Sequence, residues 1–226
     1  MKKIIILLFV LMLVSIAIAD ADPIALLFKA KGMITLERNG ENKEITTGEM
    51  LMNGDKITTG EKSYAAVKYT DNGSLIKVFP WSIVTINGTR NGDHLAKKTK
   101  LDAGKLFSKI KSHMTDQYRV ETSNTVASVK GTSFLTSVGP EGTTWIHMFK
   151  GLLDVENTIT GKKFNLEPGH TAESKSDGEV NIGPSPKLNP EIMEYIQDDL
   201  AGTQKIKVQV RDAEGNIKYI EIESAE

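Results

Sequence analysis

The chain contains no cysteine, so its fold uses neither disulfide bridges nor thiolate metal ligands. Its four histidines are far apart in the sequence: His94, His113, His147 and His170. Because none lies three to five residues from another, the ligand spacing of a zinc site is missing. We therefore expect no metal and no cofactor.

Recognised catalytic signatures are missing as well. The sequence has no Gly-x-Ser-x-Gly nucleophile elbow, no phosphate-binding loop and no dinucleotide fingerprint. The carboxylates Asp20 and Asp22 lie at the N-terminus expected after removal of a signal peptide, and Asp198-Asp199 lie at a predicted helix end. Solvation and the helix dipole explain these pairs better than acid–base catalysis. We expect a non-enzymatic protein; an enzyme acting on envelope polymers is the less favoured hypothesis.

Neither sign of charge dominates. The chain has 28 Lys and Arg against 29 Asp and Glu, for a formal net charge of −1. A nucleic-acid-binding surface is therefore not expected. One small basic run, Lys97-Lys98-Thr99-Lys100, is interpreted as a solvated loop, with attraction to an anionic lipid or polymer as the alternative.

One long apolar run is present, from Ile4 to Ala19, preceded by Lys2 and Lys3. It is shorter than the roughly 20 residues of a membrane span and ends in the small-x-small pattern that precedes signal-peptidase cleavage. We predict a signal peptide cleaved after Ala19, with Ala21 as second choice, and an uncleaved anchor as the alternative. The chain is then exported, to the periplasm or envelope of a bacterium, and the mature part does not span the membrane.

Short runs of alternating apolar and polar residues recur about every 8–12 residues, which is typical of all-β proteins. Asn-Gly pairs at Asn39-Gly40 and Asn53-Gly54 mark turns between them. Whether residues 23–31 form a helix or a strand stays open. Strands are predicted at 33–36, 45–47, 63–70, 74–79, 83–86, 118–122, 134–138, 143–149, 152–155, 164–166 and 171–173. The predicted fold is an irregular β-solenoid or β-sandwich of stacked short strands.

The stretch from Tyr118 to Val138 is predicted to be the centre of this fold. Two strand-like runs flank a bend that contains Asn124, Ser128 and Gly131. A glycine between strands often marks a corner or a close backbone approach, so we expect Gly131 to be a backbone requirement.

The composition changes after residue 173. Residues 174–189 are predicted to be a linker because they carry Pro184 and Pro186 among small polar residues. Asn189 and Pro190 then start a short helix near residues 191–200. Alternating residues at 205–210 and 217–222 predict a terminal hairpin that docks on the body or on a partner. The predicted units are 1–19, 20–173, 174–189 and 190–226.

The sequence has only two tryptophans, Trp81 and Trp145. Trp145 lies in the middle of a predicted strand, as a core residue would. Trp81 follows Phe79-Pro80 at a strand end and is a tentative binding anchor.

From residue 31 to residue 173 the order of motifs resembles a FecR domain. The motifs are Gly-Asp-x-Ile-x-Thr-Gly at 54–60, then Ser63, Ala65 and Val67, Asp71 to Ser74, Pro80 and Ser82, and the segments 101–106, 120–134, 151–155 and 166–169. The resemblance implies structural roles for Gly54, Asp55, Thr59, Gly60, Gly73, Ser74, Pro80, Gly104, Thr122, Lys130, Gly131, Thr132, Phe134, Gly151 and Gly169. Ser123-Asn124 and Lys130 depart from the Thr-Pro and Arg of the family pattern.

The resemblance implies an all-β fold and a regulatory or binding role. The best-known FecR proteins are membrane regulators that carry a signal from the periplasm to a cytoplasmic sigma factor. Here only three residues precede the apolar run and no second run follows, so we expect no transmembrane anti-sigma regulator. The favoured hypothesis is a non-catalytic envelope binding or scaffold module for a protein or cell-wall polymer. The alternative is a periplasmic signalling component; the oligomeric state stays open.

Overall fold

The computed structural model describes residues 22–71, 73–92, 94–111, 118–129, 131–201, 203–211 and 217–225, the last two ranges by their backbone. The predicted signal peptide, His113 and Lys130 lie outside these residues.

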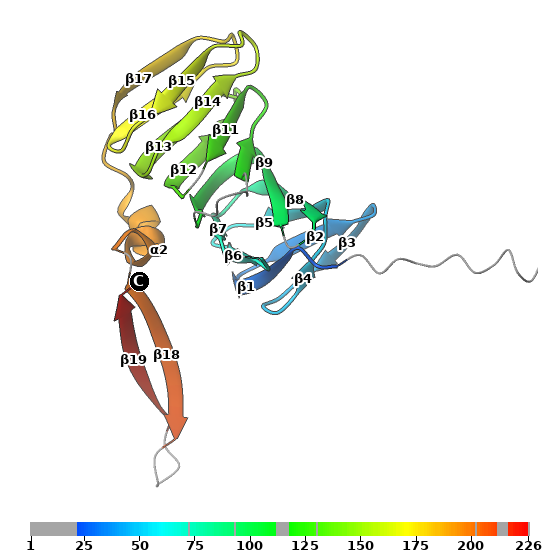
Figure 1. Cartoon of the computed structure of the whole chain (residues 1–226). Helices are drawn as coiled ribbons and strands as arrows, with labels where there is room; N and C mark the ends of the chain where they lie inside the picture. Colours follow the sequence, from blue (N-terminus) through cyan, green and yellow to red (C-terminus); the bar gives the residue numbers. More distant parts are fainter. Residues whose placement is uncertain are drawn as a thin grey trace, which may run out of the picture.

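Strands make up most of the described chain, with one helix near its C-terminal end (Figure 1). The strands of the body are β1 (Ala25–Lys31), β2 (Ile34–Arg38), β3 (Glu41–Glu44), β4 (Met50–Leu51), β5 (Asp55–Thr59), β6 (Tyr64–Tyr69), β7 (Leu75–Val78), β8 (Ile83–Asn91), β9 (His94–Lys109), β10 (Tyr118–Glu121), β11 (Thr125–Val129), β12 (Ser133–Val138), β13 (Thr144–Lys150), β14 (Leu153–Asn157), β15 (Lys163–Leu166), β16 (His170–Ser174) and β17 (Val180–Pro184). They are followed by α2 (Pro190–Ala201), β18 (Thr203–Arg211) and β19 (Ile217–Ala225). The all-β prediction, with its short helix and terminal hairpin, is confirmed.

The body is one 17-stranded sheet that divides into two ladders. The helix-side ladder has the order β4-β1-β6-β7-β9-β12-β13-β16-β17. The open ladder has the order β3-β2-β5-β8-β9-β10-β11-β14-β15. The chain crosses repeatedly from one ladder to the other. The two ladders thus form the two layers of a β-sandwich.

Strand β9 belongs to both ladders. Its first part, His94 to Ala103, pairs with β8 in the open ladder. Its last part, Gly104 to Lys109, pairs with β12 in the helix-side ladder. The pairing of β9 with β10 is parallel, whereas the other pairings of the described strands are antiparallel.

A single hydrophobic core fills the space between the ladders. Alternate residues of each strand point into it, as expected from the pleat of a β-strand. The helix-side ladder contributes Leu27, Val67, Ile76, Leu106, Phe134 and Ile146, and the open ladder contributes Leu36, Ile57, Val84, Leu101 and Val155. The outer face of the open ladder carries ion pairs such as Lys98–Glu121 and is the solvent-facing side.

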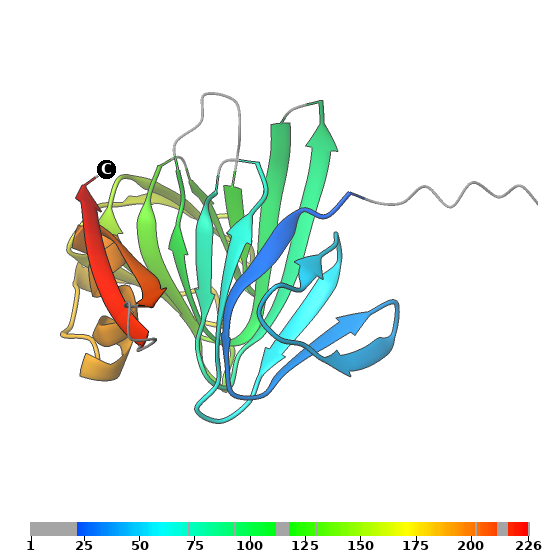
Figure 2. The same cartoon turned by 90° about the horizontal axis from the view of Figure 1, so that it is seen from below.

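Helix α2 covers the outer face of the helix-side ladder (Figures 1 and 2). Its start follows the prediction, since Asn189 Oδ1 accepts a hydrogen bond of 2.8 Å from Glu191 N and Pro190 is the first helical residue. Ile196 is fully buried against Phe79, Phe107 and Leu135. This third layer converts an apolar sheet face into an interior surface.

The terminal hairpin is formed by β18 and β19, which pair with each other and with no other described strand. It extends away from the body beyond α2 (Figure 1). Its bounds contain the predicted strands at 205–210 and 217–222.

Three local predictions are wrong. The return strand expected at 45–47 is β3, which directly follows Asn39-Gly40, because positive φ values of 55° and 82° at these two residues make a two-residue hairpin turn. The basic run at 97–100, interpreted as a solvated loop, is part of β9 in the β8–β9 hairpin, where Lys97 and Thr99 are buried. The linker expected at 174–189 contains β17, which pairs with β16.

The central stretch forms three strands rather than two. β10 and β11 make a hairpin, so Ser128 lies within a strand and not in the bend. Gly131 forms the corner between β11 and β12, with a φ of 66°. A Cβ added to Gly151, at the neighbouring corner, would lie 2.7 Å from Gly131 O, so the two corners are in close contact. The open question over residues 23–31 is settled as a strand, β1.

Replacement of Gly131 by valine should lower the free energy of unfolding by about 1–3 kcal/mol, because a β-branched residue is strained at positive φ. Urea unfolding of Gly131→Val measures the loss. Ser128→Val is the control, since it adds the same side chain at a half-buried strand position. Equal stability of the two variants would show that the glycine is incidental.

Candidate binding surface

Four neighbouring chain corners form a continuous row at one end of the sandwich, where β1, β5, β7 and β9 cross between the ladders. We call this the corner row; it consists of Gly32–Met33, Gly60–Ser63, Pro80–Ser82 and Gly104–Lys105. Hydrogen bonds join successive corners: Gly60 N donates to Met33 O at 3.1 Å, and Trp81 N donates to Gly60 O at 3.4 Å. The row is therefore built by residues that are distant in sequence.

Hydroxyl groups stitch these corners together. Thr59 Oγ1 donates to Phe79 O at 2.6 Å and accepts from Ser82 N at 3.0 Å. Ser82 Oγ accepts from Lys105 N at 2.9 Å and donates to Lys105 O at 3.2 Å. Both side chains are buried, so the hydroxyls satisfy backbone groups that the corners would otherwise leave unpaired.

Gly104 is the corner inside β9. Its φ is 86°, and an added Cβ would lie 2.2 Å from Ser82 Oγ and 2.5 Å from Trp81 O. Both the backbone conformation and the space therefore require glycine. This is the position at which β9 passes from the open ladder to the helix-side ladder.

Trp81 is the unusual member of the row. It has a φ of 58°, in the left-handed region that bulky side chains rarely adopt, and its side chain is 67% exposed. An exposed tryptophan held in a strained conformation gains little from packing. Strained residues of this kind cluster at functional sites, which supports the prediction that Trp81 is a binding anchor.

Met33 lies in the corner on the other side of Gly60–Ser63 and is 63% exposed. Three lysines, Lys31, Lys62 and Lys105, are exposed on the same row. None of the three forms an ion pair within the described residues, and Glu61 is the acidic residue that accompanies them. The row thus combines two exposed apolar side chains with unneutralised positive charge.

A buried polar cluster closes the same end of the C-terminal half of the sandwich. Asn124 Oδ1 accepts from Thr144 Oγ1 at 2.8 Å and Thr125 Oγ1 at 3.0 Å, and its Nδ2 donates to Ser174 O at 3.0 Å. Thr122 Oγ1 lies 2.8 Å from Thr144 Oγ1. Because these groups satisfy one another, the cluster is structural, and Asn124 serves as its centre.

A second buried polar group lies in the core near the opposite end. Lys97 Nζ pairs with Asp71 Oδ2, and the two side chains are only 1% and 4% exposed. Next to them, Thr99 Oγ1 is 2.8 Å from both Tyr69 Oη and Tyr118 Oη. Burial raises the pKa of Tyr118 to about 12 and the pKa of Tyr69 well above its ordinary value, so both phenols stay protonated, and Tyr118 Oη donates to Thr99 Oγ1. The prediction of a solvated loop is therefore wrong for Lys97.

The groove that receives α2 is aromatic. Tyr195 of the helix stacks on Tyr64 with ring centroids 4.5 Å apart and meets Phe79 edge-on. Lys77 Nζ donates to Tyr195 O at 2.6 Å and pairs with Asp199. Asp199 therefore helps to hold α2 on the sheet, a role that could not be predicted from its neighbours in the sequence.

The other candidate residues form no catalytic arrangement. His147 Nδ1 lies 2.7 Å from Thr171 Oγ1, which lies 2.9 Å from Ser185 Oγ. Burial lowers the pKa of His147, so it is neutral near pH 7. Among the described residues no group of His, Asp or Glu could hold a metal ion. No described helix is long and apolar enough to cross a membrane.

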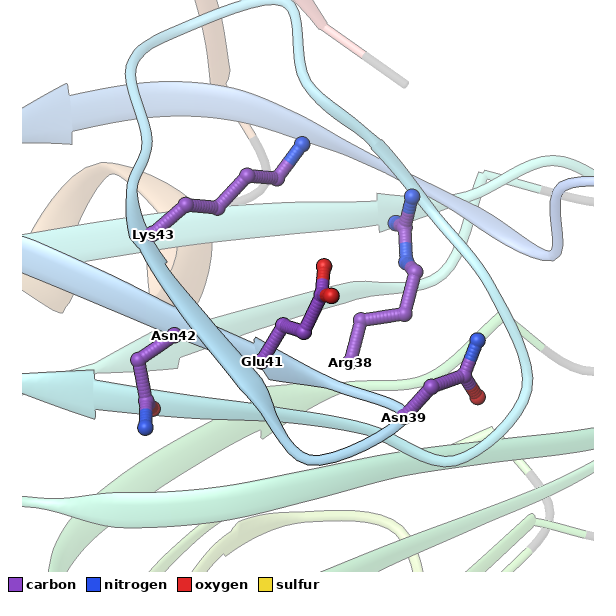
Figure 3. Close-up of a pocket in the computed structure, with 5 residues that line it drawn as sticks. All are labelled: Arg38, Asn39, Glu41, Asn42 and Lys43. Carbon is purple, nitrogen blue, oxygen red and sulfur yellow. The ribbon is translucent and has the colours of Figure 1, made fainter.

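A shallow pocket at the β2–β3 hairpin is lined by Arg38, Asn39, Glu41, Asn42 and Lys43 (Figure 3). Arg38 is already engaged, because its Nε and Nη2 donate to the two carboxylate oxygens of Asp55 at 2.8 and 2.6 Å. Lys43 pairs with Glu49 at 2.8 Å. Its cations are neutralised, so the pocket is a poor anion site.

The remaining residues with expected structural roles lie at turns, corners or in the core. Gly54, Gly73 and Gly169 have positive φ. Asp55 is buried, and its carboxylate accepts two hydrogen bonds from Arg38. Ser74 Oγ accepts from Lys111 N at 3.1 Å, and Thr132 O accepts from Ile110 N at 2.8 Å. Phe134 is in the core. Sequence reasoning missed the partners Arg38, Lys77 and Tyr195, and it identified Asp71, Ser82 and Asn124 only as motif or bend residues.

The fold is all-β, with stacked corners where the chain passes between two ladders. Residues 55–153 match the model of the family described as FecR protein. The chain therefore carries a FecR domain, as its motif order indicated. No curated protein matches the sequence.

Two solved structures share the fold. Both are crystal structures of a "putative anti-sigma factor" from Parabacteroides distasonis ATCC 8503, at 1.65 and 2.50 Å resolution. Each has 14% sequence identity and a TM-score of 0.51, and the match covers 66% of this chain and 66% of that chain. The chain thus spans slightly less than two thirds of that protein's length.

Replacement of Trp81 by asparagine should stabilise the protein by about 1 kcal/mol, because asparagine adopts the left-handed conformation more readily than tryptophan. Thermal unfolding of Trp81→Asn measures the gain. Lys62→Asn is the matched control, since Lys62 has a φ of 52° and should respond in the same direction. A lower melting temperature for Trp81→Asn alone would show that the indole contributes packing that outweighs its strain.

Replacement of Lys97 by methionine should cost about 3–5 kcal/mol, because it leaves the Asp71 carboxylate buried without its cation. The double variant Lys97→Met/Asp71→Leu should recover much of that loss. Lys98→Met, at a side chain that is 47% exposed, should change stability by less than about 0.5 kcal/mol. Urea unfolding compares the three; a double variant as unstable as Lys97→Met would contradict this account.

Proposed function

We propose that this chain is a non-enzymatic component of an envelope signal-transduction system and acts by binding a protein partner. The FecR domain at residues 55–153 carries the proposal. The fold shared with a protein described as an anti-sigma factor supports a regulatory role. The expected export places this role in the bacterial periplasm or envelope.

The structure offers support for binding rather than catalysis. The Asn124 cluster and the Lys97–Asp71 pair join buried polar side chains to one another at a corner and in the core. Such groups stabilise a rigid body and are not aimed at a substrate. A rigid body of this kind is suited to presenting surfaces to another macromolecule.

The terminal hairpin is the segment that we assign to the protein partner. Its register runs from Thr203↔Ala225 to Arg211↔Ile217, and the strand alternation places Ile206, Val208 and Ile220 on one face. A two-stranded hairpin is marginally stable in water. We infer that its apolar face and free strand edges are completed by a partner, in the manner of strand addition.

Helix α2 links this hairpin to the FecR domain. The residues that receive the helix, among them Tyr64, Lys77 and Phe79, all lie within the matched range 55–153. Partner binding at the hairpin is thus connected mechanically to the β body. This connection is what a signalling component requires.

Replacement of Val208 by lysine should abolish signalling, because it places a charge on the apolar face of the hairpin. We expect the strain carrying Val208→Lys to reproduce the transcript changes caused by deleting the gene. Gln209→Lys is the matched control: it introduces the same residue one position along, on the opposite face, and should leave transcripts unchanged.

Two outcomes separate the hypotheses. Unchanged transcripts after deletion of the gene would favour a static scaffold over a signalling component. Equal effects of the two lysine variants would remove the hairpin face from the proposal. Tryptophan fluorescence and circular dichroism of both purified variants verify that the body remains folded.

A further inference from the structure

The corner row carries exposed side chains that belong neither to the FecR motifs nor to the proposed protein contact. Its apolar tips are Trp81 and Met33, both more than half exposed. They lie on either side of the Gly60–Ser63 corner, since Gly60 N donates to Met33 O and Gly60 O accepts from Trp81 N. The two apolar side chains therefore flank the Gly60–Ser63 corner at the end of the sandwich.

Positive charge surrounds these tips, although the chain as a whole has a net charge of −1. Lys31 precedes the Gly32–Met33 corner, and Lys62 lies in the Gly60–Ser63 corner. The backbone of Lys105 is bonded to Ser82, one residue from Trp81. All three ammonium groups are exposed without an ion pair among the described residues, and only Glu61 of the row opposes them.

We propose that the corner row docks on an anionic lipid bilayer surface. Tryptophan places its apolar ring and polar edge at the lipid–water boundary, and lysine reaches the headgroups while its stem stays in apolar surroundings. Clustered lysines are attracted to the negative potential of such a surface. The row supplies both components on one line of corners.

The geometry favours a membrane over a folded protein as the occupant. The row is a line of chain reversals that end the sheets, with protruding apolar tips, and a deformable planar surface can accept such tips. Protein–protein interfaces are depleted of lysine, whereas here lysine is the commonest charged residue. Trp81 occupies a left-handed corner position that glycine or asparagine would adopt more easily, so the exposed indole is present there at the cost of backbone strain.

Vesicle binding tests the proposal directly. The purified chain is mixed with vesicles of phosphatidylcholine containing 30% phosphatidylglycerol or with pure phosphatidylcholine, in about 0.1 M salt, where charges further apart than about 10 Å are screened. Flotation measures partitioning. A Trp145→Phe background leaves Trp81 as the only tryptophan, so a blue shift of its emission reports insertion of the corner row.

We expect binding to the anionic vesicles with a blue shift of Trp81. The triple variant Lys31→Gln/Lys62→Gln/Lys105→Gln should reduce partitioning by on the order of 100-fold, since each lysine near the surface contributes about fivefold or more. Trp81→Asn should weaken binding while preserving the folded state.

Two matched controls separate the row from general charge and hydrophobicity. Lys56→Gln/Lys98→Gln/Lys163→Gln removes the same number of charges from the open ladder, where these lysines pair with Glu37, Glu121 and Glu156. Phe28→Ala removes an exposed aromatic, 56% exposed with Lys68 5.8 Å from its ring centroid, outside the row. Both controls should bind vesicles as the unmodified chain does.

The proposal is overturned if anionic vesicles do not bind the chain or if neutral vesicles bind it equally. It is also overturned if the open-ladder control loses as much binding as the corner-row variant, or if Trp81 emission does not shift. These results are independent of the hairpin, so failure here leaves the proposed signalling role to its own test.

Discussion

The fold depends on the backbone pairing of a single strand, β9, with neighbours in two sheets. Its first part bonds to β8 and β10, and its last part to β7 and β12. The passage between ladders requires a residue at positive φ with almost no side-chain space, which is Gly104. Because Ser82 bonds to both backbone groups of Lys105, the next residue, the crossing also positions the Trp81 corner. The structural and the exposed features of the corner row thus share one origin.

The family motifs acquire a physical explanation from this arrangement. The chain passes between ladders at the motif residues Thr59, Gly60, Pro80 and Gly104. The hydroxyl of Thr59 bonds the backbone of a neighbouring corner, and the absence of a side chain at Gly104 lets the next corner approach closely. Gly131 and Gly151 do the same at the opposite end. The motif order therefore specifies a scaffold. To that scaffold the chain adds the exposed Trp81, the Asn124 cluster, the docked helix α2 and the terminal hairpin.

These additions lie on different parts of the molecule. The corner row is at an end of the sandwich, α2 covers an outer face, and the hairpin extends beyond the helix (Figure 1). A lipid contact at the row and a protein contact at the hairpin would thus involve separate surfaces.

The sequence by itself determined the features that arise from local physics. Period-two alternation indicated strands, Asn39-Gly40 specified a tight hairpin, and Asn189-Pro190 specified a helix start, because each depends on residues close in the chain. The order of motifs likewise identified the FecR domain. Only the tertiary structure decided which ladder each strand joins, since that depends on pairings between distant residues. For the same reason it turned Lys97 from an apparent loop residue into a buried ion pair with Asp71, gave Asp199 its partner Lys77, and placed Trp81 in a left-handed corner beside Gly60 and Gly104.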